Sequence, residues 1–147
     1  MDTIQSANID GKLIRKDMAK MVSNFAVNVL KKVPSTGTKC TFSDTKGLTE
    51  EAKSFAILSC KLGLMGFESD GITVKKHFDP MDQVDRAQFG TILSRLLRAG
   101  KYNGGNPYYA KHLNALKNAG IMTKIATPLQ KEIRGYVMLM MMRATSK

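Results

Sequence analysis

Apolar residues recur at steps of three and four along much of the chain, which is the spacing of one face of an α-helix. The first such segment covers about residues 13–32 and ends before Pro34. Four more segments follow, each opened by a residue that can cap a helix. These capping residues are Thr49, Asp85, Asn106 and Thr127. Alternating strand patterns are nearly absent, so the sequence predicts an all-α domain.

The five predicted helices are of two kinds that repeat along the chain. Two of them end in glycine, then leucine or isoleucine, then methionine, at Gly63 and Gly120. The other three carry an arginine in the first turn, followed by apolar residues three, six and seven positions later. These arginines are Arg15, Arg86 and Arg134. The repeating unit is therefore one helix of each kind, and the first copy holds only the arginine-bearing helix.

The middle copy resembles the repeat of the S-layer homology (SLH) family. That repeat has an F-x-D start, a helix ending in L-G-I-x-x-G, an acidic-Gly turn, F-x-P and the motif T-R-A-E. The corresponding segments here are Phe42-Ser43-Asp44, Leu62-Gly63-Leu64-Met65-Gly66, Asp70-Gly71, Phe78-Asp79-Pro80 and Asp85-Arg86-Ala87-Gln88. The last copy departs from the pattern, with Thr123 at the second glycine and Tyr136 at the acid of T-R-A-E.

The resemblance implies helical repeats in a three-lobed, pseudo-threefold arrangement. It implies one domain over residues 1–147, with a partial repeat at 8–33 and repeats at 40–99 and 106–144. Each half-repeat cannot bury its apolar face alone, so matching positions of the three copies should meet near the axis. Candidates for these positions are Met18, Phe89 and Val137.

The resemblance also implies a function. SLH-like proteins anchor exported proteins, without covalent linkage, to acidic and often pyruvylated cell-wall polysaccharide. The chain would then be an extracellular, non-catalytic anchoring module and part of a larger exported protein. The arginine of T-R-A-E implies ligand contacts at Arg15, Arg86 and Arg134, and pairing of each arginine with a neighbouring acid is the alternative. Acids surround Arg86 in the sequence, so we expect Arg15 and Arg134 to contribute more.

The net charge of +11 is unevenly divided along the chain. Residues 1–39 balance to +4, residues 40–105 to +1 and residues 106–147 to +6. This excess favours an acidic partner, which could be a glycan, nucleic acid or a membrane surface. A basic nucleic-acid-binding helical domain and a protein-docking bundle built on the methionine-rich last helix stay open as alternatives. No apolar run is long enough for a membrane span.

Residues suited to catalysis or metal binding are sparse. The two histidines stand alone, and there is no Walker loop, GxSxG or HExxH, so we predict no enzyme, no metal and no cofactor. Tyr109 follows a glycine-rich run, as do Tyr102 and Tyr108, and could stack on a sugar ring or pack against the protein.

Cys40 and Cys60 are too few for a disulfide scaffold and lack the CxxC spacing. In an exported module we expect them to form a disulfide, and two buried thiols in a cytosolic protein are the alternative. Residues 1–7 lack the features of a signal peptide, as expected of a cytosolic protein or of a trimmed fragment.

Overall fold

The computed structural model describes residues 11–132 and 134–145. The helices are α2 (Arg15–Asn24), α3 (Glu50–Lys61), α4 (Arg86–Arg98), α5 (Ala110–Asn118) and α6 (Arg134–Thr145), and a π-helical turn, η1 (Phe25–Val29), continues α2. The part of the chain so described contains no strand, only isolated β-bridges. The all-α fold class is therefore confirmed.

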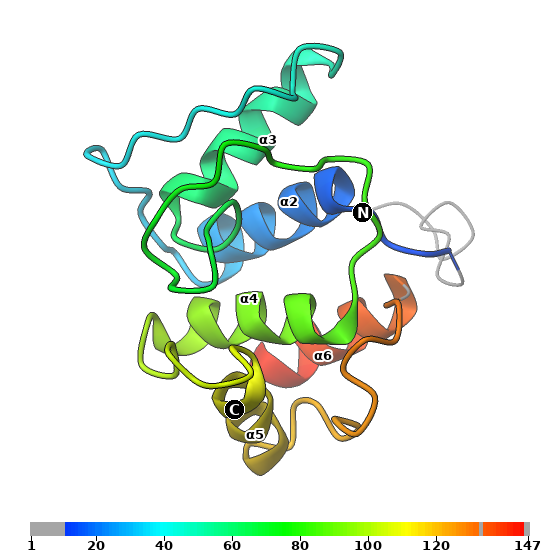
Figure 1. Cartoon of the computed structure of the whole chain (residues 1–147). Coiled ribbons are helices and arrows are strands. Elements are labelled where there is room, and N and C mark those ends of the chain that lie inside the picture. Colours follow the sequence, from blue (N-terminus) through cyan, green and yellow to red (C-terminus); the bar gives the residue numbers. More distant parts are fainter. Residues whose placement is uncertain (1–10, 133, 146–147) are drawn as a thin grey trace.

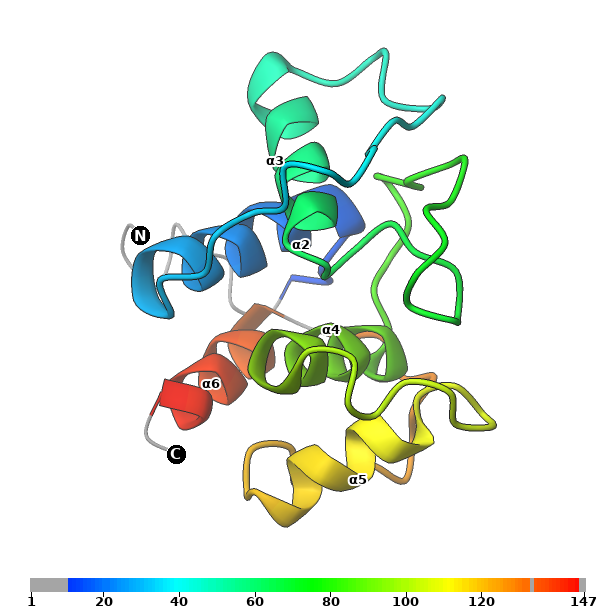
Figure 2. The same ribbon diagram turned by 90° about the vertical axis from the view of Figure 1, so that its left-hand side faces the viewer.

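The helices form two groups stacked one above the other. Helix α2 packs against α3, and α4 packs against α5 and α6 (Figure 1). In both views α4 and α6 lie beneath α2 (Figure 2). The segment that follows α3, drawn in green, connects the two groups.

Local capping explains why two of the helices begin where the sequence predicts. The Thr49 hydroxyl accepts a hydrogen bond from the backbone N–H of Ala52 at 3.1 Å, which opens α3. Asp85 and Gln88 form a capping box at the start of α4. The Asp85 carboxylate accepts from Gln88 N at 2.8 Å, and the Gln88 side chain accepts from Asp85 N at 3.0 Å. Both predicted caps are confirmed.

The predicted starts of the last two helices were wrong. Helix α5 begins at Ala110 rather than after Asn106, and α6 begins at Arg134 rather than after Thr127. The segment before α6 forms a turn, in which Gln130 N donates to Thr127 O at 3.1 Å, and two of its carbonyls accept from the first turn of α4. The bonds run from Arg86 N to Gln130 O at 2.9 Å and from Ala87 N to Pro128 O at 2.8 Å.

The starts of α2, α4 and α6 are joined by a closed ring of three backbone hydrogen bonds. Leu13 N donates to Glu132 O at 3.2 Å, Glu132 N donates to Val84 O at 2.8 Å, and Val84 N donates to Leu13 O at 2.8 Å. Each of these residues lies two positions before the arginine that opens its helix. Three segments far apart in the sequence therefore meet at one point.

A second set of backbone bonds repeats around the same three helix starts. The N–H of each arginine donates to the carbonyl four positions before the next arginine in the ring. The pairs are Arg15 with Asp82 at 2.9 Å, Arg86 with Gln130 at 2.9 Å and Arg134 with Gly11 at 3.1 Å. The three junctions thus use equivalent backbone positions.

The buried hydrophobic residues form one cluster to which α2, α3, α4, α5 and α6 all contribute. Met18, Phe89 and Val137, each three positions after a helix-opening arginine, are fully buried in it. Cys40 and Cys60 form a disulfide that ties the segment before α3 to the last turn of that helix.

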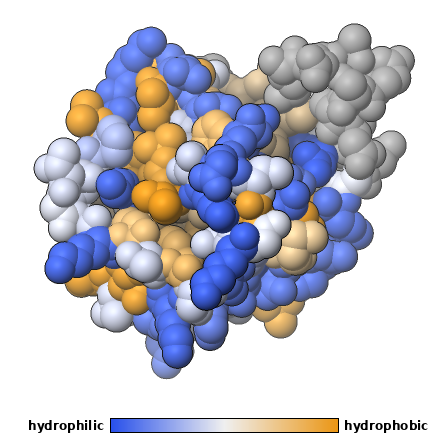
Figure 3. Space-filling view, turned by 90° about the horizontal axis from the view of Figure 1, so that it is seen from above, coloured by the Kyte–Doolittle hydropathy of each residue, from blue (hydrophilic) through white to orange (hydrophobic). Residues whose placement is uncertain are grey.

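The surface is mainly polar. On the face seen in Figure 3, hydrophobic residues form small patches among hydrophilic side chains. In the described ranges, no helix combines the length and the apolar composition that a membrane span requires.

Candidate functional site

Arg15 opens α2, and its side chain contacts the segment before α4. Its Nε donates to the Phe78 carbonyl at 2.7 Å, and its guanidinium carbon lies 5.2 Å from the centre of the Phe78 ring. Phe78 is held in turn by Asp44, whose carboxylate accepts from the backbone N–H groups of Phe78 and Asp79, each at 2.8 Å. The F-x-D motif at residues 42–44 and the F-x-P motif at residues 78–80 are therefore joined to each other, and the second contacts Arg15.

The Arg15 guanidinium is a partly dehydrated cation. Burial lowers the pKa of Arg15 from its ordinary value, while the nearby Asp79 and Asp82 act in the opposite direction. An arginine stays charged at neutral pH despite such a shift. Within the described ranges Arg15 takes part in no ion pair. Its two terminal nitrogens are therefore available to an anion, and attraction to an anion is stronger where water is partly excluded.

Arg15 lines a cavity of about 280 Å³ between α4 and the segment that follows α3. We call it the Arg15 cavity, and its walls include Arg15, residues 64–69, Lys75, Gln88, Thr91, Arg95 and Tyr108. Three of these side chains are cationic, and Glu68 is the one acid among the described residues that line it. The cavity is therefore electrostatically suited to a ligand with negative charge.

Other groups in the Arg15 cavity are also hydrogen-bond donors. Gln88 uses its side-chain oxygen in the capping box, which leaves the amide nitrogen for another partner. The Thr91 hydroxyl is buried and has no partner in the structure. Burial raises the pKa of the Tyr108 hydroxyl, with a contribution from Asp85 in the same direction, so this group stays protonated and can donate. An acceptor-rich ligand would satisfy these donors.

The tyrosines differ in position. Tyr108 lines the Arg15 cavity, whereas Tyr109 caps α5 and packs against the core. The two rings meet edge to face, with centroids 5.2 Å apart. Tyr109 therefore orients Tyr108, and the aromatic face next to the candidate ligand site belongs to Tyr108.

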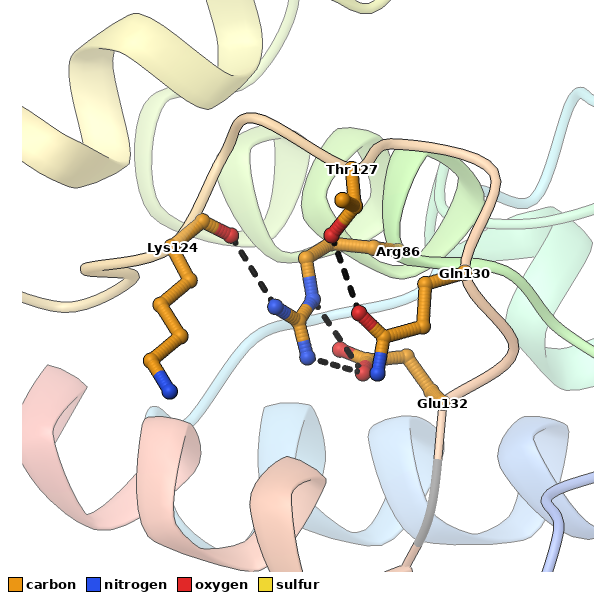
Figure 4. A network of polar contacts seen from close by, with 5 residues as sticks. All are labelled: Arg86, Lys124, Thr127, Gln130 and Glu132. Carbon is orange, nitrogen blue, oxygen red and sulfur yellow. Dashed lines mark hydrogen bonds and ion pairs between the residues drawn. The ribbon is translucent and has the colours of Figure 1, made fainter.

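Arg86 occupies the equivalent place at the start of α4, but an acid already holds it. Its Nη2 lies 2.9 Å from Glu132 Oε1, its Nε lies 3.3 Å from the same oxygen, and its Nη1 donates to the Lys124 carbonyl at 3.0 Å. Figure 4 shows the guanidinium enclosed between these groups. The Arg86 and Glu132 side chains are only 6% and 0% exposed, so the pair is a buried structural contact.

Arg86 lines a second cavity of about 230 Å³, the Arg86 cavity. Its other walls include Met122, Thr123, Lys124, Tyr136, Leu139, Met140 and Arg143. Arg134 lies 48 residues after Arg86. Four residues of α6 in the wall of the Arg86 cavity each lie 48 residues after a residue of α4 in the wall of the Arg15 cavity. These pairs are Gln88 with Tyr136, Thr91 with Leu139, Ile92 with Met140 and Arg95 with Arg143. The two cavities are therefore built from equivalent positions, but the second is more apolar.

Arg134 also has an acidic partner. Its Nη2 lies 2.7 Å from Asp17 Oδ2, and the two side chains are 24% and 33% exposed. Asp17 holds the acid position of the T-R-A-E motif in the first copy. Arg86 is thus paired with an acid in the segment before α6 and Arg134 with an acid on α2, whereas Arg15 lines a cavity without an ion pair among the described residues.

Lys75 and Arg95 were not among the residues that sequence reasoning selected. Arg95 lies nine positions after Arg86, as Arg143 does after Arg134, so the alignment of the repeats contained a signal for it. Lys75 lies in the loop before α4, and the corresponding loop before α6 is shorter, since Gly63 to Arg86 is 23 positions and Gly120 to Arg134 is 14. No sequence pattern marks Lys75.

Comparison with known proteins adds no family to this description. No family model matches the chain, and no curated protein matches it. Its function is therefore inferred from the residues and their geometry.

Proposed function

We propose that the chain is a non-catalytic module that binds acidic cell-wall polysaccharide in the Arg15 cavity. The observation that carries this proposal is the convergence of Arg15, Lys75 and Arg95 on one cavity, with Arg15 in no ion pair among the described residues. A guanidinium can bind a carboxylate through two parallel hydrogen bonds, which gives both strength and orientation.

The proposal includes a three-lobed, pseudo-threefold arrangement of the SLH type. It is supported by the closed ring of hydrogen bonds among Leu13, Val84 and Glu132, which lie at equivalent positions of the three copies. It is also supported by the matching wall positions of the Arg15 and Arg86 cavities. In such an arrangement each cavity lies between neighbouring copies of the repeat.

A glycan fits the Arg15 cavity better than duplex nucleic acid does. Cavities that enclose a small ligand or a sugar unit are commonly about 300 Å³ or larger, and the Arg15 cavity is close to this size. Proteins that bind duplexes instead present a basic stripe or a helix to a groove. Here the cations line a concave site beside Tyr108, whose ring can stack on a sugar.

The disulfide supports a location outside the cytoplasm. Disulfides form and persist in oxidising compartments and are rare in cytosolic proteins. Mass spectrometry of the exported, unreduced protein should show Cys40 and Cys60 joined. Two free thiols in that sample would contradict an extracellular site of action.

Affinity measurements on matched variants test the proposal. We expect Arg15→Gln to weaken binding to acidic, pyruvylated wall polysaccharide by about 10- to 100-fold, the range for a lost hydrogen bond to a charged group. Arg98→Gln removes the same charge from an exposed position of α4 outside the cavity and should change affinity less than about twofold. Chemical reduction of the polysaccharide carboxylates should abolish binding to the wild-type protein.

Duplex DNA provides the second comparison. Equal affinity for DNA and for the polysaccharide, with similar losses in Arg15→Gln and Arg98→Gln, would indicate a diffuse attraction to polyanions. That result would overturn the proposed site.

A further inference from the structure

A second, larger cavity adjoins the Arg15 cavity at the C-terminal end of α4. Its volume is about 340 Å³, and Leu64 and Arg95 line both cavities. We call it the Asn103 cavity, and its polar walls are Lys32, Arg95 and Asn103. Together the two cavities follow α4 from Gln88 to Leu96 and reach Gly100 just beyond its C-terminal end.

Arg95 is held between the two cavities by a buried network. Its Nε donates to Asn103 Oδ1 at 3.1 Å, and His112 Nε2 lies 3.0 Å from the same oxygen. An amide oxygen only accepts, so His112 Nε2 carries the proton. The other ring nitrogen, Nδ1, then accepts from the Ser94 hydroxyl at 2.7 Å. This chain of contacts fixes Arg95 through Nε and leaves its two terminal nitrogens for another partner.

The same network orients the Asn103 amide. Because its oxygen accepts two hydrogen bonds, its nitrogen retains both N–H groups, and none of the described residues accepts from them. Gly71 permits the close approach of the neighbouring loop, since a Cβ atom there would lie 2.5 Å from Asn103 Nδ2 and 3.0 Å from Arg95 Nη2. The donors are therefore built into the wall of the cavity.

The charged and amide side chains of the Asn103 cavity are all donors. Lys32 is exposed and takes part in no ion pair among the described residues, and no aspartate or glutamate of these residues lines the cavity. Asp70 is the acid that acts on Arg95 through space, but its carboxylate accepts from the backbone of Ile72 and Thr73. A ligand group that only accepts hydrogen bonds, such as a carboxylate, matches this lining.

We propose that the Asn103 cavity is a second subsite that binds the carboxylate of the next acidic unit of the same polysaccharide chain. This inference rests on the proposed function. The protein then recognises a chain of at least two acidic units rather than a single sugar. Arg95, shared by both cavities, contacts both units.

Fragments of the wall polysaccharide with one and four acidic units provide the test. The measured quantity is the ratio of the two affinities, which is independent of the fraction of folded protein because both are measured on one sample. For the wild-type protein we expect the four-unit fragment to bind at least about tenfold more tightly, since the second subsite adds a charge-assisted contact.

Two variants should reduce this ratio. Asn103→Asp keeps the oxygen that Arg95 and His112 use, but replaces the donor nitrogen by a negatively charged acceptor. Lys32→Gln removes the cation at the far side of the cavity. We expect both to bring the ratio down to about fourfold, the statistical advantage of four units that can each occupy one subsite. Lys39→Gln, at an exposed position outside both cavities, should keep the wild-type ratio.

The outcomes distinguish the two proposals. If Arg15→Gln weakens binding of the one-unit fragment but all the proteins show the same ratio, the second subsite is wrong and the Arg15 site stands. If neither fragment nor the intact polysaccharide binds the wild-type protein, both proposals are wrong.

Discussion

The Arg15 and Arg86 cavities are built from equivalent positions, yet their arginines have different partners. The different partners follow from one position, which lies two residues before the following helix-opening arginine. For Arg15 this residue is Val84, two before Arg86, and for Arg86 it is Glu132, two before Arg134. Glu132 pairs with Arg86 in the protein interior, whereas the nonpolar Val84 offers Arg15 no acid, and the Arg15 guanidinium donates to a backbone carbonyl. One position thus separates a buried, paired arginine from one that faces a cavity without an ion pair among the described residues.

The largest effect should follow from breaking the buried pair. Arg86→Ala leaves the Glu132 carboxylate buried without a cation, and we expect the free energy of unfolding to fall by about 3–5 kcal/mol. Urea unfolding followed by circular dichroism measures the loss. The double variant Arg86→Met with Glu132→Val removes both charges and should recover most of it. A loss below about 1 kcal/mol in Arg86→Ala would show that the pair is not structural.

Gly66 in the Arg15 cavity and Thr123 in the Arg86 cavity occupy equivalent positions of the repeat, but substitution by alanine should change stability differently at each. Gly66 has φ +88°, and a Cβ atom there would lie 2.5 Å from the Phe42 ring, so Gly66→Ala should cost about 2–3 kcal/mol of stability. Its counterpart in the Arg86 cavity, Thr123, is exposed, and Thr123→Ala should change stability by less than about 0.5 kcal/mol. Thermal unfolding of the two variants compares them, and similar values would contradict the difference between the cavities.

His112 supports Arg95, a wall residue of the Arg15 cavity, through the oxygen of Asn103. Burial lowers the pKa of His112 to about 4, and the nearby Arg95 acts in the same direction. The folded state therefore favours the neutral ring, and its stabilising contribution is complete above the unfolded pKa of about 6.5 and is lost as the pH falls toward 4.

Urea unfolding between pH 7 and pH 4 should show this loss, on the order of 2 kcal/mol. The pKa of Asp44 is raised by burial but lowered overall by backbone hydrogen bonds. Its stabilising contribution is therefore lost only below this pH range, because its ordinary pKa is about 3.8. The variant His112→Gln should be less stable at pH 7 and should have a flatter dependence on pH. An unchanged slope would exclude His112 as the cause.

The smallest effect should come from the pair that holds Arg134. Both side chains are partly exposed, so Asp17→Asn should lower the free energy of unfolding by at most about 1 kcal/mol. Urea unfolding in low and high salt checks this value, because screening weakens an exposed pair more than a buried one. A loss as large as that of Arg86→Ala would show that the third arginine is as structural as the second.

Local signals in the sequence predicted the fold class and the starts of α3 and α4, because capping depends on residues close in the chain. The same reasoning failed for α6. Thr127 and Gln130 have the spacing of a capping box, but the Thr127 hydroxyl donates to the Gln130 side chain, and the backbone there serves α4 instead. Hydrogen bonds to the first turn of α4, which is distant in the sequence, therefore determine the conformation of this segment.

The candidate site was predictable only in part for the same reason. The repeat pattern and the SLH resemblance selected Arg15 together with Arg86 and Arg134, and did not separate Arg15 from Arg134, which the structure pairs with Asp17. The acids that flank Arg86 in the sequence were expected to weaken its role, yet Asp79 and Asp82 act on Arg15, and the partner of Arg86 lies 46 residues away. Which acids lie near each arginine depends on how the starts of α2, α4 and α6 pack together, and the spacing of residues in the sequence does not reveal this packing.

We propose that the ligand contacts Arg15 and does not contact Arg86 or Arg134. NMR spectra of the arginine Nε–H groups, assigned by arginine-to-lysine variants and recorded during titration with one-unit fragments of the wall polysaccharide, test it directly. We expect the signals of Arg15 and Arg95 to shift until the protein is saturated, while those of Arg86 and Arg134 stay in place. Equal small shifts of all four signals, or a shift confined to Arg86, would contradict it.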